Sequence, residues 1–498
     1  MSVRHIIVQA GGKGTRLKHL TRNRPKALVP VDNLPIIFHL FRTFPEARFV
    51  IIGDYKKDVM RKYLAAFADV DYLLVDANGA GTCAGIEPAL ALIPQGEPFM
   101  LIWSDLILPC DIEMPSGLEN CIGLSQDFPC RWSYRNGVFE ETPSTDAGVA
   151  GMFIFKEKTV LAGVPESGEF VRWLQGQEIG FTTIPLRRTK EYGLLETIDM
   201  PEGGRCRPFN RMTIDGDKIV KEGIDEQGKQ LAVREKGWYR HVEELGFDAI
   251  PAIYSYDPFV MERISGKNIF EYDLSFEEKR IVLEKLVNQL KKLHSLESGP
   301  VDYFSIKEAY YRKTVDRLNK VRDLVPFADQ REIVINGKRC RNVFYCQQEL
   351  ERALDRVSCA CFCLIHGDCT FSNMLLRNGE DPILIDPRGY FGHTKMLGDP
   401  LYDWAKLYYS LVGNYDQFNL RRFELVVMDS EVSLSIASNG WEDMESCFFE
   451  LLESEVDSSD IRLIHAIIWL SLTTYAWEDY DSICGSFYNG LLYLEEAL

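Results

Sequence analysis

The 498-residue sequence has no long hydrophobic run and no excess of positive charge. Its longest apolar stretch, from Leu463 to Trp477, is interrupted by His465 and falls short of the roughly 20 residues that a membrane-spanning helix needs. Lys and Arg together number 56 against 74 Asp and Glu, which gives a net charge of −18. Such a charge disfavours nucleic acid or an anionic membrane surface as the main partner. We therefore expect neither nucleic acid nor a membrane among the partners.

Paired cysteine spacing is also lacking. The 13 cysteines are scattered, without the spacing of a zinc site or the density of a small disulfide scaffold, so we expect reduced thiols. The opening MSVRHIIVQA has too short an apolar part for a secretory signal and runs directly into glycines, so it predicts a strand. These features favour a cytoplasmic protein, and the sequence is compatible with a homo-oligomer.

The first two fifths of the chain have the pattern of an α/β domain. From residue 5 to about 105, short apolar runs alternate with stretches of helical period, which is typical of βαβ units in a mainly parallel sheet. The segment MPEGGRCRPFN then interrupts the pattern with prolines and glycines. We therefore expect one domain over residues 1–203, with a mixed, mainly parallel sheet.

The remainder, residues 204–498, predicts a second domain with two lobes. RMTIDGDKIVKEG has the pattern of a β-hairpin, followed by a helical stretch over 229–245 and a pair of strands over 253–264. From residue 275 onward long helical patterns dominate, with short strand-like segments at 361–366 and 383–386. The pattern indicates a small β-rich lobe joined to a large helical one.

A glycine-rich loop directly follows the first predicted strand. Its glycines allow the backbone to approach a ligand closely, so that N–H groups point at phosphate oxygens. Arg16 adds positive charge there, and Lys26 follows ten residues later on a stretch held by two prolines. The residues of this loop that we expect to bind nucleotide are Ala10, Gly11, Gly12, Lys13, Gly14 and Thr15.

Together these motifs resemble the signature of the sugar nucleotidyltransferases, which join a nucleoside triphosphate to a sugar phosphate and release pyrophosphate. The resemblance covers residues 3–203 and implies a Rossmann-like fold. It implies that Gly81 and Thr82, in the small-residue turn over residues 79–86, contact the nucleotide base. It also implies that Asp105, after an apolar strand, and Asp199, within ETIDMPE, bind a metal ion.

Two carboxylates suit one Mg²⁺ whose remaining ligands are triphosphate oxygens and water. Attack of a sugar phosphate on an α-phosphorus needs positioning and charge neutralisation more than an acid or a base. We therefore assign Lys26 and Arg16 as catalytic, with Lys26 bridging the acceptor and the α-phosphate. Cys83 replaces the commoner alanine in the turn, so the base stays open among CTP, UTP and GTP.

A second group of polar residues lies in the C-terminal half. Asp368 follows a short apolar strand, Asn373 comes five residues later, and Asp386 ends another strand. In this arrangement the first carboxylate accepts a hydroxyl proton, while the other two side chains bind Mg²⁺ under the phosphates of ATP.

These runs, HGDxxxxN and IDPR, resemble those of the aminoglycoside phosphotransferase and choline kinase family, relatives of the protein kinases. The resemblance covers residues 205–498 and implies an α+β bilobal kinase-like fold. It implies a lysine that holds the ATP phosphates, for which Lys221 is the candidate, paired with Glu235 in the following helix. It also implies that the backbone of Met261 and Glu262 meets adenine.

The two domains suggest consecutive reactions on small molecules. The C-terminal domain is expected to phosphorylate a hydroxyl compound, preferably a sugar, with ATP, and the N-terminal domain to convert the product into an NDP-sugar for a surface polysaccharide or glycoconjugate. One alternative is a choline or aminoalcohol kinase joined to a cytidylyltransferase that gives a CDP-alcohol. Others are an antibiotic-modifying kinase and a nucleotide-binding regulatory protein with an inactive domain.

Overall fold

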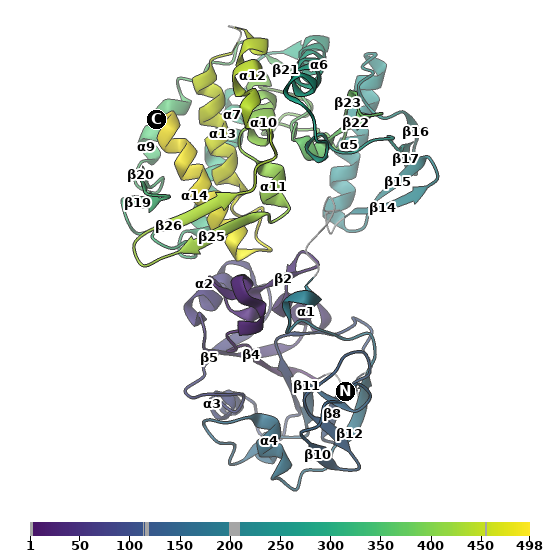
Figure 1. Ribbon diagram of the computed structural model, residues 1–498, viewed down its shortest axis with the longest axis vertical. Helices are drawn as coiled ribbons and strands as arrows, with labels where there is room; N and C mark the ends of the chain where they lie inside the picture. Colours follow the sequence, from purple (N-terminus) through teal and green to yellow (C-terminus); the bar gives the residue numbers. More distant parts are fainter. Residues whose placement is uncertain (1–2, 113, 115–118, 199–209, 454–455) are drawn as a thin grey trace. The chain divides into compact units, whose positions relative to one another are not determined.

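The computed structural model describes residues 3–498 except 113, 115–118, 199–209 and 454–455 (Figure 1). The chain forms two compact units, one of residues 1–199 with 477–480 and one of residues 200–476 with 481–498. The domain boundary that the sequence predicts near residue 204 lies outside the described residues and stays a prediction. Each unit is described by itself below.

The N-terminal unit is built on a mixed sheet in which nine strands are described. In spatial order its main path runs through β10 (Val138–Glu140), β9 (Ser133–Arg135), β11 (Gly148–Phe155), β6 (Phe99–Trp103), β1 (His5–Gln9), β4 (Arg48–Gly53) and β5 (Tyr72–Asp76). Off this path, β8 (Cys121–Ser125) pairs with β11 and with β12 (Thr182–Leu186). β1 is parallel to both β4 and β6, whereas β11 runs antiparallel to β6.

Helices and two short pairs of strands complete this unit. They are α1 (Ile36–Thr43), α2 (Lys57–Phe67), α3 (Ile86–Ala91), α4 (Phe170–Gln175), the pair β2 (Pro30–Val31) and β3 (Leu34–Pro35), and the pair β7 (Leu106–Ile107) and β13 (Lys190–Glu191). Ile6, Ile7 and Val8 of β1 are completely buried, as expected for a central strand covered on both faces. The expected α/β fold with a mainly parallel sheet is confirmed.

The C-terminal unit begins with a small antiparallel sheet in the order β14 (Asn210–Asp215), β15 (Lys218–Gly223), β17 (Phe259–Glu262) and β16 (Ile253–Tyr256). The predicted hairpin is β14 and β15, which pair with Asp215 opposite Lys218. The helix after it, α5 (Glu226–Glu244), begins three residues earlier than its pattern suggests, because Asp225 caps it by accepting a hydrogen bond from the Gly228 N–H.

A larger lobe follows, built mainly around helices. They are α6 (Phe276–Leu296), α7 (Tyr303–Lys307), a π-helical turn η6 (Glu308–Arg312), α8 (Lys313–Val321), α9 (Gln347–Leu354), α10 (Pro400–Leu411), α11 (Tyr415–Asn419), α12 (Glu445–Leu452), α13 (Ser458–Leu472) and α14 (Tyr480–Ala497). Short strands near the predicted catalytic motif are β18 (Ser298–Gly299), β21 (Phe362–Leu364), β24 (Leu397–Gly398), β22 (Met374–Arg377) and β23 (Asp381–Leu384). The small sheet followed by this lobe gives the bilobal arrangement that was predicted.

One sheet in this lobe was not predicted from the sequence. It has the order β20 (Lys338–Arg341), β19 (Glu332–Ile335), β26 (Val432–Ile436) and β25 (Phe423–Val427), and lies beside α14 in Figure 1. β19 meets β26 through a single pairing, Ile335 with Val432, almost a hundred residues apart along the chain. A long-range pairing of this kind leaves no local signal in the sequence.

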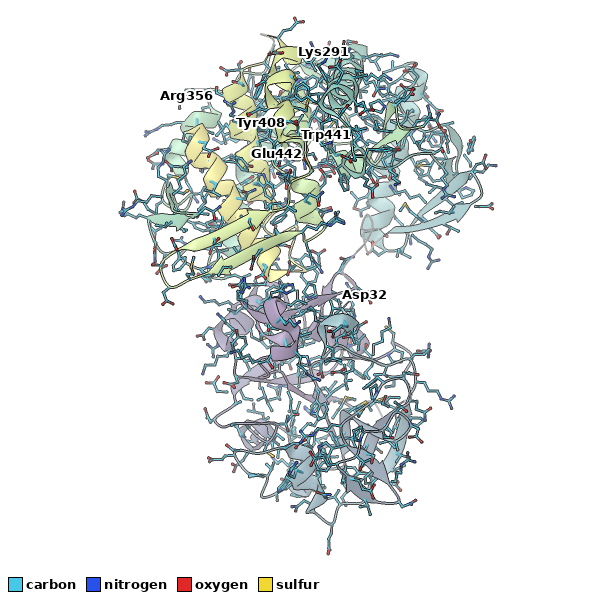
Figure 2. The ribbon with its side chains drawn as sticks, in the orientation of Figure 1. Asp32, Lys291, Arg356, Tyr408, Trp441 and Glu442 are labelled. Carbon is cyan, nitrogen blue, oxygen red and sulfur yellow. The ribbon has the colours of Figure 1, made fainter. Side chains whose placement is uncertain are left out.

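The core of the helical lobe is rich in aromatic side chains. Trp441 is completely buried, and its ring centre lies 5.0 Å from that of Phe371, next to the predicted catalytic motif (Figure 2). Tyr408 on α10 packs edge-on against His465 on α13, with ring centres 5.0 Å apart. Such contacts fix α10, from which part of the candidate site is built.

Candidate functional sites

A cavity of about 970 Å³ opens in the N-terminal unit where β1, β4 and β6 end. In a parallel α/β sheet, the carboxyl ends of the strands are where ligands bind. Most residues predicted for nucleotide and metal binding line this cavity: Gly11, Gly12, Lys13, Arg16, Lys26, Gly81, Thr82 and Asp105.

Three residues of the predicted loop lie outside the cavity lining, and a fourth prediction is not described. Ala10 is buried and continues β1, with its N–H donating to the Ile52 carbonyl. Gly14 has a positive φ of 64° and faces Lys26, where an added Cβ would come within 3.1 Å of the lysine Cβ. Thr15 is exposed and begins a 3₁₀ helix. Asp199 lies outside the described residues.

Lys26 and Asp105 form an ion pair inside the cavity. Both side chains are largely buried, and Oδ1 of Asp105 has no hydrogen-bond partner among the described residues. Gln9, at the end of β1, presents a buried Oε1 that is likewise unpartnered in the described part of the chain. Buried oxygens that accept no hydrogen bond are suitable ligands for a hard cation such as Mg²⁺. The residues present therefore fit the predicted metal.

Glu191 is a cavity residue that sequence analysis missed. Strand β13 pairs with β7 so that Glu191 lies opposite Leu106, and the N–H of Tyr192 donates to the Asp105 carbonyl at 2.9 Å. Burial raises the pKa of the Glu191 carboxyl, and the negative charge of Asp105 raises it further, while Lys26 and Arg16 oppose the shift. A second acidic group therefore stands beside Asp105 within the described residues. Glu191 lies on a strand of only two residues, which is too short to be predicted from a sequence pattern.

The cavity wall depends on close backbone approaches. A Cβ at Gly81 would lie 2.4 Å from the Gly168 carbonyl oxygen, and one at Gly151 would lie 2.1 Å from the ring of Trp103. Both glycines also have positive φ, 86° and 90°, which other residues adopt at a cost. The small-residue turn is thus required by packing as well as by any ligand.

In the C-terminal unit, Lys221 on β15 joins two predicted carboxylates. Its Nζ donates to Oε1 of Glu235 on α5 at 2.8 Å and to Oδ1 of Asp386, just after β23, at 2.6 Å. Burial alone lowers the pKa of Lys221, but the neighbouring Asp386 and Glu235 carboxylates outweigh it and raise the pKa. The lysine is therefore a fixed positive charge at the junction of the small sheet and the helical lobe.

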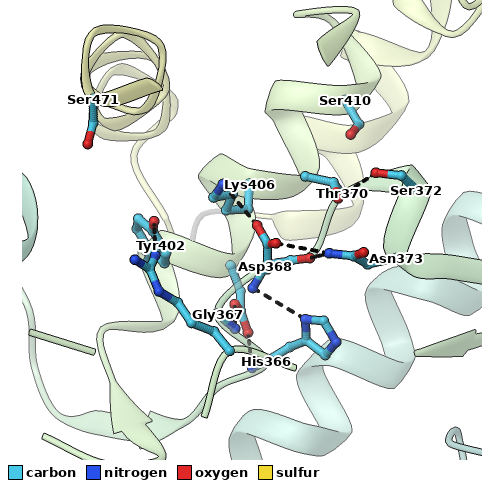
Figure 3. A network of polar contacts seen from close by, with 12 residues as sticks. His366, Gly367, Asp368, Thr370, Ser372, Asn373, Tyr402, Lys406, Ser410 and Ser471 are labelled. Atoms are coloured by element: carbon cyan, nitrogen blue, oxygen red, sulfur yellow. Dashed lines mark hydrogen bonds and ion pairs between the residues drawn. The ribbon is translucent and has the colours of Figure 1, made fainter. Parts of the chain in front are cut away.

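Asp368 lies in the loop after β21 and is held from two sides (Figure 3). Asn373 donates from Nδ2 to Oδ2 of Asp368 at 3.0 Å, and also to its main-chain carbonyl at 2.9 Å. Lys406, on α10, makes an ion pair with Oδ1 at 2.9 Å. Sequence analysis missed Lys406. Its only clue is that it lies three residues after Asp403 on one helix face.

A buried scaffold positions this loop. Asp403 accepts the backbone N–H groups of His366 at 2.9 Å and Gly367 at 2.7 Å, and pairs with His294. Burial lowers the pKa of His366, whose Nε2 lies 3.0 Å from the Ile385 carbonyl oxygen. His366 is therefore neutral and links the Asp368 loop to the segment that carries Asp386.

Met261 and Glu262 end strand β17, and the Glu262 carboxylate pairs with Arg377 of β22 at 2.7 Å. The Glu262 N–H already donates to the Ala252 carbonyl, so this group is engaged within the protein. The proposed contact of this strand with adenine stays a prediction. Asn373 and Asp386 supply an amide and a carboxylate oxygen, a donor set that suits Mg²⁺ with triphosphate oxygens completing its shell. Within the described residues, no group of three or more His, Cys, Asp or Glu side chains could hold a metal by itself.

Comparison with known families gives one match for each unit. Residues 6–113 match the MobA-like NTP transferase domain, and residues 215–424 match the phosphotransferase enzyme family. The chain joins an NTP transferase domain to an APH-type phosphotransferase domain. The resemblances drawn from the sequence motifs are thereby confirmed. The match to the NTP transferase domain includes the glycine loop and Asp105 but ends before Glu191.

Two curated relatives each match less than a quarter of this chain. UTP–glucose-1-phosphate uridylyltransferase AglF of Haloferax volcanii is 40% identical over 113 residues, which are 21% of this chain and 45% of that protein. The bifunctional protein GlmU of Methanococcus maripaludis is 30% identical over 122 residues, 24% of this chain and 29% of the relative. The chain thus spans less than half the length of these relatives.

Among solved structures, HddC from Yersinia pseudotuberculosis is 20% identical, with a TM-score of 0.34, and the match covers 39% of this chain and 96% of that chain. In the described part of the protein, no helix combines the length and apolar character needed to cross a membrane.

Proposed function

We propose that the phosphotransferase domain phosphorylates a small hydroxyl compound, a sugar, with ATP. The NTP transferase domain then transfers a nucleotidyl group from CTP, UTP or GTP to the phosphorylated product and releases pyrophosphate. The result is an NDP-sugar, an activated building block for a polysaccharide or glycoconjugate. Because both reactions use nucleoside triphosphates, we place the enzyme in the cytoplasm.

The geometry of Asp368 supports the first reaction most directly. Lys406 and Asn373 each engage one oxygen of its carboxylate, which fixes the direction in which the group points. An aimed carboxylate can accept the proton of a substrate hydroxyl as its oxygen attacks the γ-phosphorus of ATP. Lys221 supplies positive charge for the ATP phosphates, and Asn373 with Asp386 would hold Mg²⁺, which neutralises phosphate charge when bound.

Support for the second reaction comes from the cavity of the NTP transferase domain. The residues that line it include three cations, Lys13, Arg16 and Lys26, together with the glycine loop. These charges suit a triphosphate, and the loop backbone suits its oxygens. Asp105, beside Lys26, would hold Mg²⁺, which binds phosphate oxygens; Lys26 neutralises the charge that develops as the acceptor phosphate attacks the α-phosphorus.

A sugar is the preferred acceptor because relatives of this domain carry sugar names. AglF is named for glucose 1-phosphate, and two relatives from Oryza sativa, 32% identical over 110 residues, are probable mannose-1-phosphate guanylyltransferases. A choline-type substrate would instead need an aromatic cage around its ammonium group.

A pyrophosphate-release assay tests the proposal. The full chain is incubated with Mg²⁺ and each of CTP, UTP and GTP, with a panel of free sugars and aminoalcohols, in the presence and absence of ATP. We expect pyrophosphate only when ATP and one particular compound are both present, and without an ATP requirement when the 1-phosphate of that compound replaces it. Release from the 1-phosphate, with no ATP-dependent phosphorylation of any compound, would refute the coupled reaction.

A further inference from the structure

Positive charges gather on one side of Asp368. Figure 3 shows Asn373 on one side of the Asp368 carboxylate and Lys406 with Tyr402 on the other. Ile385, the residue before Asp386, donates its N–H to the Asn373 carbonyl at 3.0 Å, so Asp386 lies on the Asn373 side. Asp386 pairs with Lys221, and these two residues are assigned above to Mg²⁺ and ATP. The Lys406 side is therefore the side left for the acceptor.

Arg388 is the second cation on this side. Its backbone N–H donates to the His366 carbonyl, and a Cβ at Gly367 would lie 2.9 Å from the Arg388 Cβ, so the side chain begins directly beside the Asp368 loop. The guanidinium donates to the hydroxyl of Tyr402 at 2.7 Å and of Tyr390 at 3.1 Å. Both partners are phenol hydroxyls, so neither contact gives Arg388 a carboxylate.

Tyr390 also brings a further cation to the cluster. The guanidinium of Arg234, on α5, lies 4.6 Å from the centre of the Tyr390 ring, the same distance as that of Arg388. Positive charge from Arg388 and Arg234 offsets the effect of burial and lowers the pKa of the Tyr390 hydroxyl.

Helix α8 contributes two more cations, one turn apart. Arg317 donates to the carbonyl and the hydroxyl of Ser471 at 2.6 and 3.0 Å and lies 6.0 Å from the ring centre of Tyr475, again without a carboxylate partner in these contacts. Lys313 is half-buried and makes no hydrogen bond or ion pair with any described residue.

Lys313 is the clearest sign of an absent anion. Burial and repulsion from Arg388, Arg317 and Lys406 lower its pKa, and the attraction of Glu308 is weaker than each of these repulsions. Lys406 is paired with Asp368, but Lys313, Arg317 and Arg388 are held together without a carboxylate in the contacts described above. These three cations repel one another, and a bound anion would offset that repulsion.

We propose that the acceptor phosphorylated by this domain is itself an anion, with a phosphate or carboxylate group held by Lys313, Arg317 and Arg388 while its hydroxyl faces Asp368. The inference rests on the proposed kinase function and narrows its substrate class. The hydroxyl oxygen bonds to the γ-phosphorus of ATP, its proton passes to Asp368, and the bond to the β,γ-bridging oxygen breaks to release ADP. Cationic acceptors such as choline or aminoglycosides are repelled by the same cluster.

A matched acceptor panel tests this proposal. The full chain is assayed for ATP-dependent phosphorylation of glucose, glucose 6-phosphate, glucuronate, choline and kanamycin, so that a neutral sugar is compared with its phosphate, its carboxylate and two cations. We expect turnover of an anionic member with a KM at least tenfold below that of glucose. Preference for glucuronate over the phosphate would identify a carboxylate as the anion, and the reverse a phosphate. Preference for glucose, choline or kanamycin overturns the proposal.

Two variants assign the effect to the cluster. Lys313→Gln should raise the KM of the anionic acceptor tenfold or more, with a smaller change in the KM of ATP. Arg312→Gln removes an equal charge one residue earlier, where the guanidinium stacks on Phe304 at 4.7 Å, and should leave the acceptor KM within twofold. A rise in the KM of ATP alone would assign the cations to the nucleotide and refute an acceptor site.

A binding measurement decides the matter even if no panel member is phosphorylated. The melting temperature of the full chain, saturated with ADP and Mg²⁺, is followed as inorganic phosphate is added. We expect phosphate to stabilise the wild type and Arg312→Gln equally, and Lys313→Gln clearly less. Equal stabilisation of all three proteins refutes an anion site at Lys313, whereas a missing kinase activity with a Lys313-dependent response contradicts only the proposed function.

Discussion

Lys221 donates to Glu235 at 2.8 Å, although the two residues lie on different elements, β15 and α5. The same ammonium group reaches Asp386, 165 residues further along the chain. One buried charge therefore ties together the hairpin, the first helix and the segment after β23.

Lys221→Met should abolish most of the phosphotransferase activity. Without the ammonium group, the ATP phosphates lose a fixed positive charge, and removal of one such stabilising group typically costs about 10²–10³ in kcat. ADP formation with the accepted substrate measures the loss. Pyrophosphate release from the pre-phosphorylated compound should stay within twofold of the wild type. Loss of both activities together would contradict two independent sites.

Asp368→Asn should remove the general base while keeping the shape of the loop. The expected fall in kcat is about 10²–10⁴, the range typical of a positioned proton acceptor. Single-turnover phosphorylation measures the fall in kcat. Asp403→Asn is unsuitable as a control, because Asp403 accepts hydrogen bonds from the backbone N–H groups of His366 and Gly367. Glu442→Gln, at a residue of the same lobe that accepts hydrogen bonds from Asn414 and Ser438, serves instead and should retain full activity. Wild-type turnover in Asp368→Asn would show that this carboxylate takes no proton.

Lys26→Met should stop nucleotidyl transfer and spare phosphorylation. The variant leaves Asp105 without its ion-pair partner in a largely buried position, and leaves the incoming phosphates without a central cation. We expect pyrophosphate release to fall by about 10² or more. Lys62→Met, at an exposed lysine of α2, is the matched control. Equal rates in Lys26→Met and Lys62→Met would exclude Lys26 from the reaction.

Gly151→Ala tests whether the cavity wall is as tight as the backbone indicates. The added methyl group would overlap the ring of Trp103, which lines the cavity, and the positive φ of 90° adds backbone strain. We expect a loss of about 1–3 kcal/mol in the stability of the NTP transferase domain together with a higher KM for NTP. Gly96 also has a positive φ, 76°, but a Cβ added there has no neighbour within 4 Å. Gly96→Ala therefore measures the effect of backbone strain without steric overlap. Identical melting and kinetics for both variants would show that Trp103 moves aside at no cost.

Much of both candidate sites follows from local patterns in the sequence. The glycine loop and Asp105 follow the ends of β1 and β6 in a regular βαβ pattern, and that pattern fixes where they meet. Lys26 lies in a short 3₁₀ helix that the pattern does not place. The C-terminal motif likewise keeps Asp368 and Asn373 on one short loop. Spacing and strand context placed these residues, and the resemblance to known families implied the metal role of Asp105.

What the sequence did not predict depends on contacts between distant residues. Glu191 reaches Asp105 through a two-residue strand, and Lys406 reaches Asp368 from a helix more than thirty residues later. Lys313 joins Arg388 only because α8 and the segment after β23 are brought together by the fold. A single charged side chain on an amphipathic helix looks the same whether it faces water or a site, so its role appears only in three dimensions.

Burial of His465 should make the phosphotransferase domain less stable at acidic pH. The side chain is completely buried on α13, its Nε2 accepts a hydrogen bond from the Trp469 indole at 2.9 Å, and burial lowers its pKa to about 3. In the unfolded chain the histidine takes up a proton near pH 6.5, whereas in the folded domain it stays neutral. The stability that this difference contributes is fully present above about pH 6.5 and is lost as the pH falls toward 3. This direction is the same as that of a buried neutral base anywhere in a protein.

Comparison of the wild type with His465→Gln, which retains an acceptor for Trp469, isolates this effect. Between about pH 7.5 and about pH 5.5, the free energy of unfolding of the wild type should fall by about 1.4 kcal/mol more than that of the variant. Over this range the histidine of the unfolded chain becomes protonated, whereas the buried histidine of the folded domain stays neutral, and this favours the unfolded state about tenfold. Urea unfolding followed by the fluorescence of the lobe's tryptophans measures both. The variant is expected to be less stable at the higher pH, because glutamine fills the aromatic site poorly. The test is therefore the difference between the two proteins in how the free energy of unfolding changes with pH. Parallel pH dependences would mean that His465 takes up a proton in the folded domain, which in turn requires an acceptor near Nδ1, an atom without a partner among the described residues.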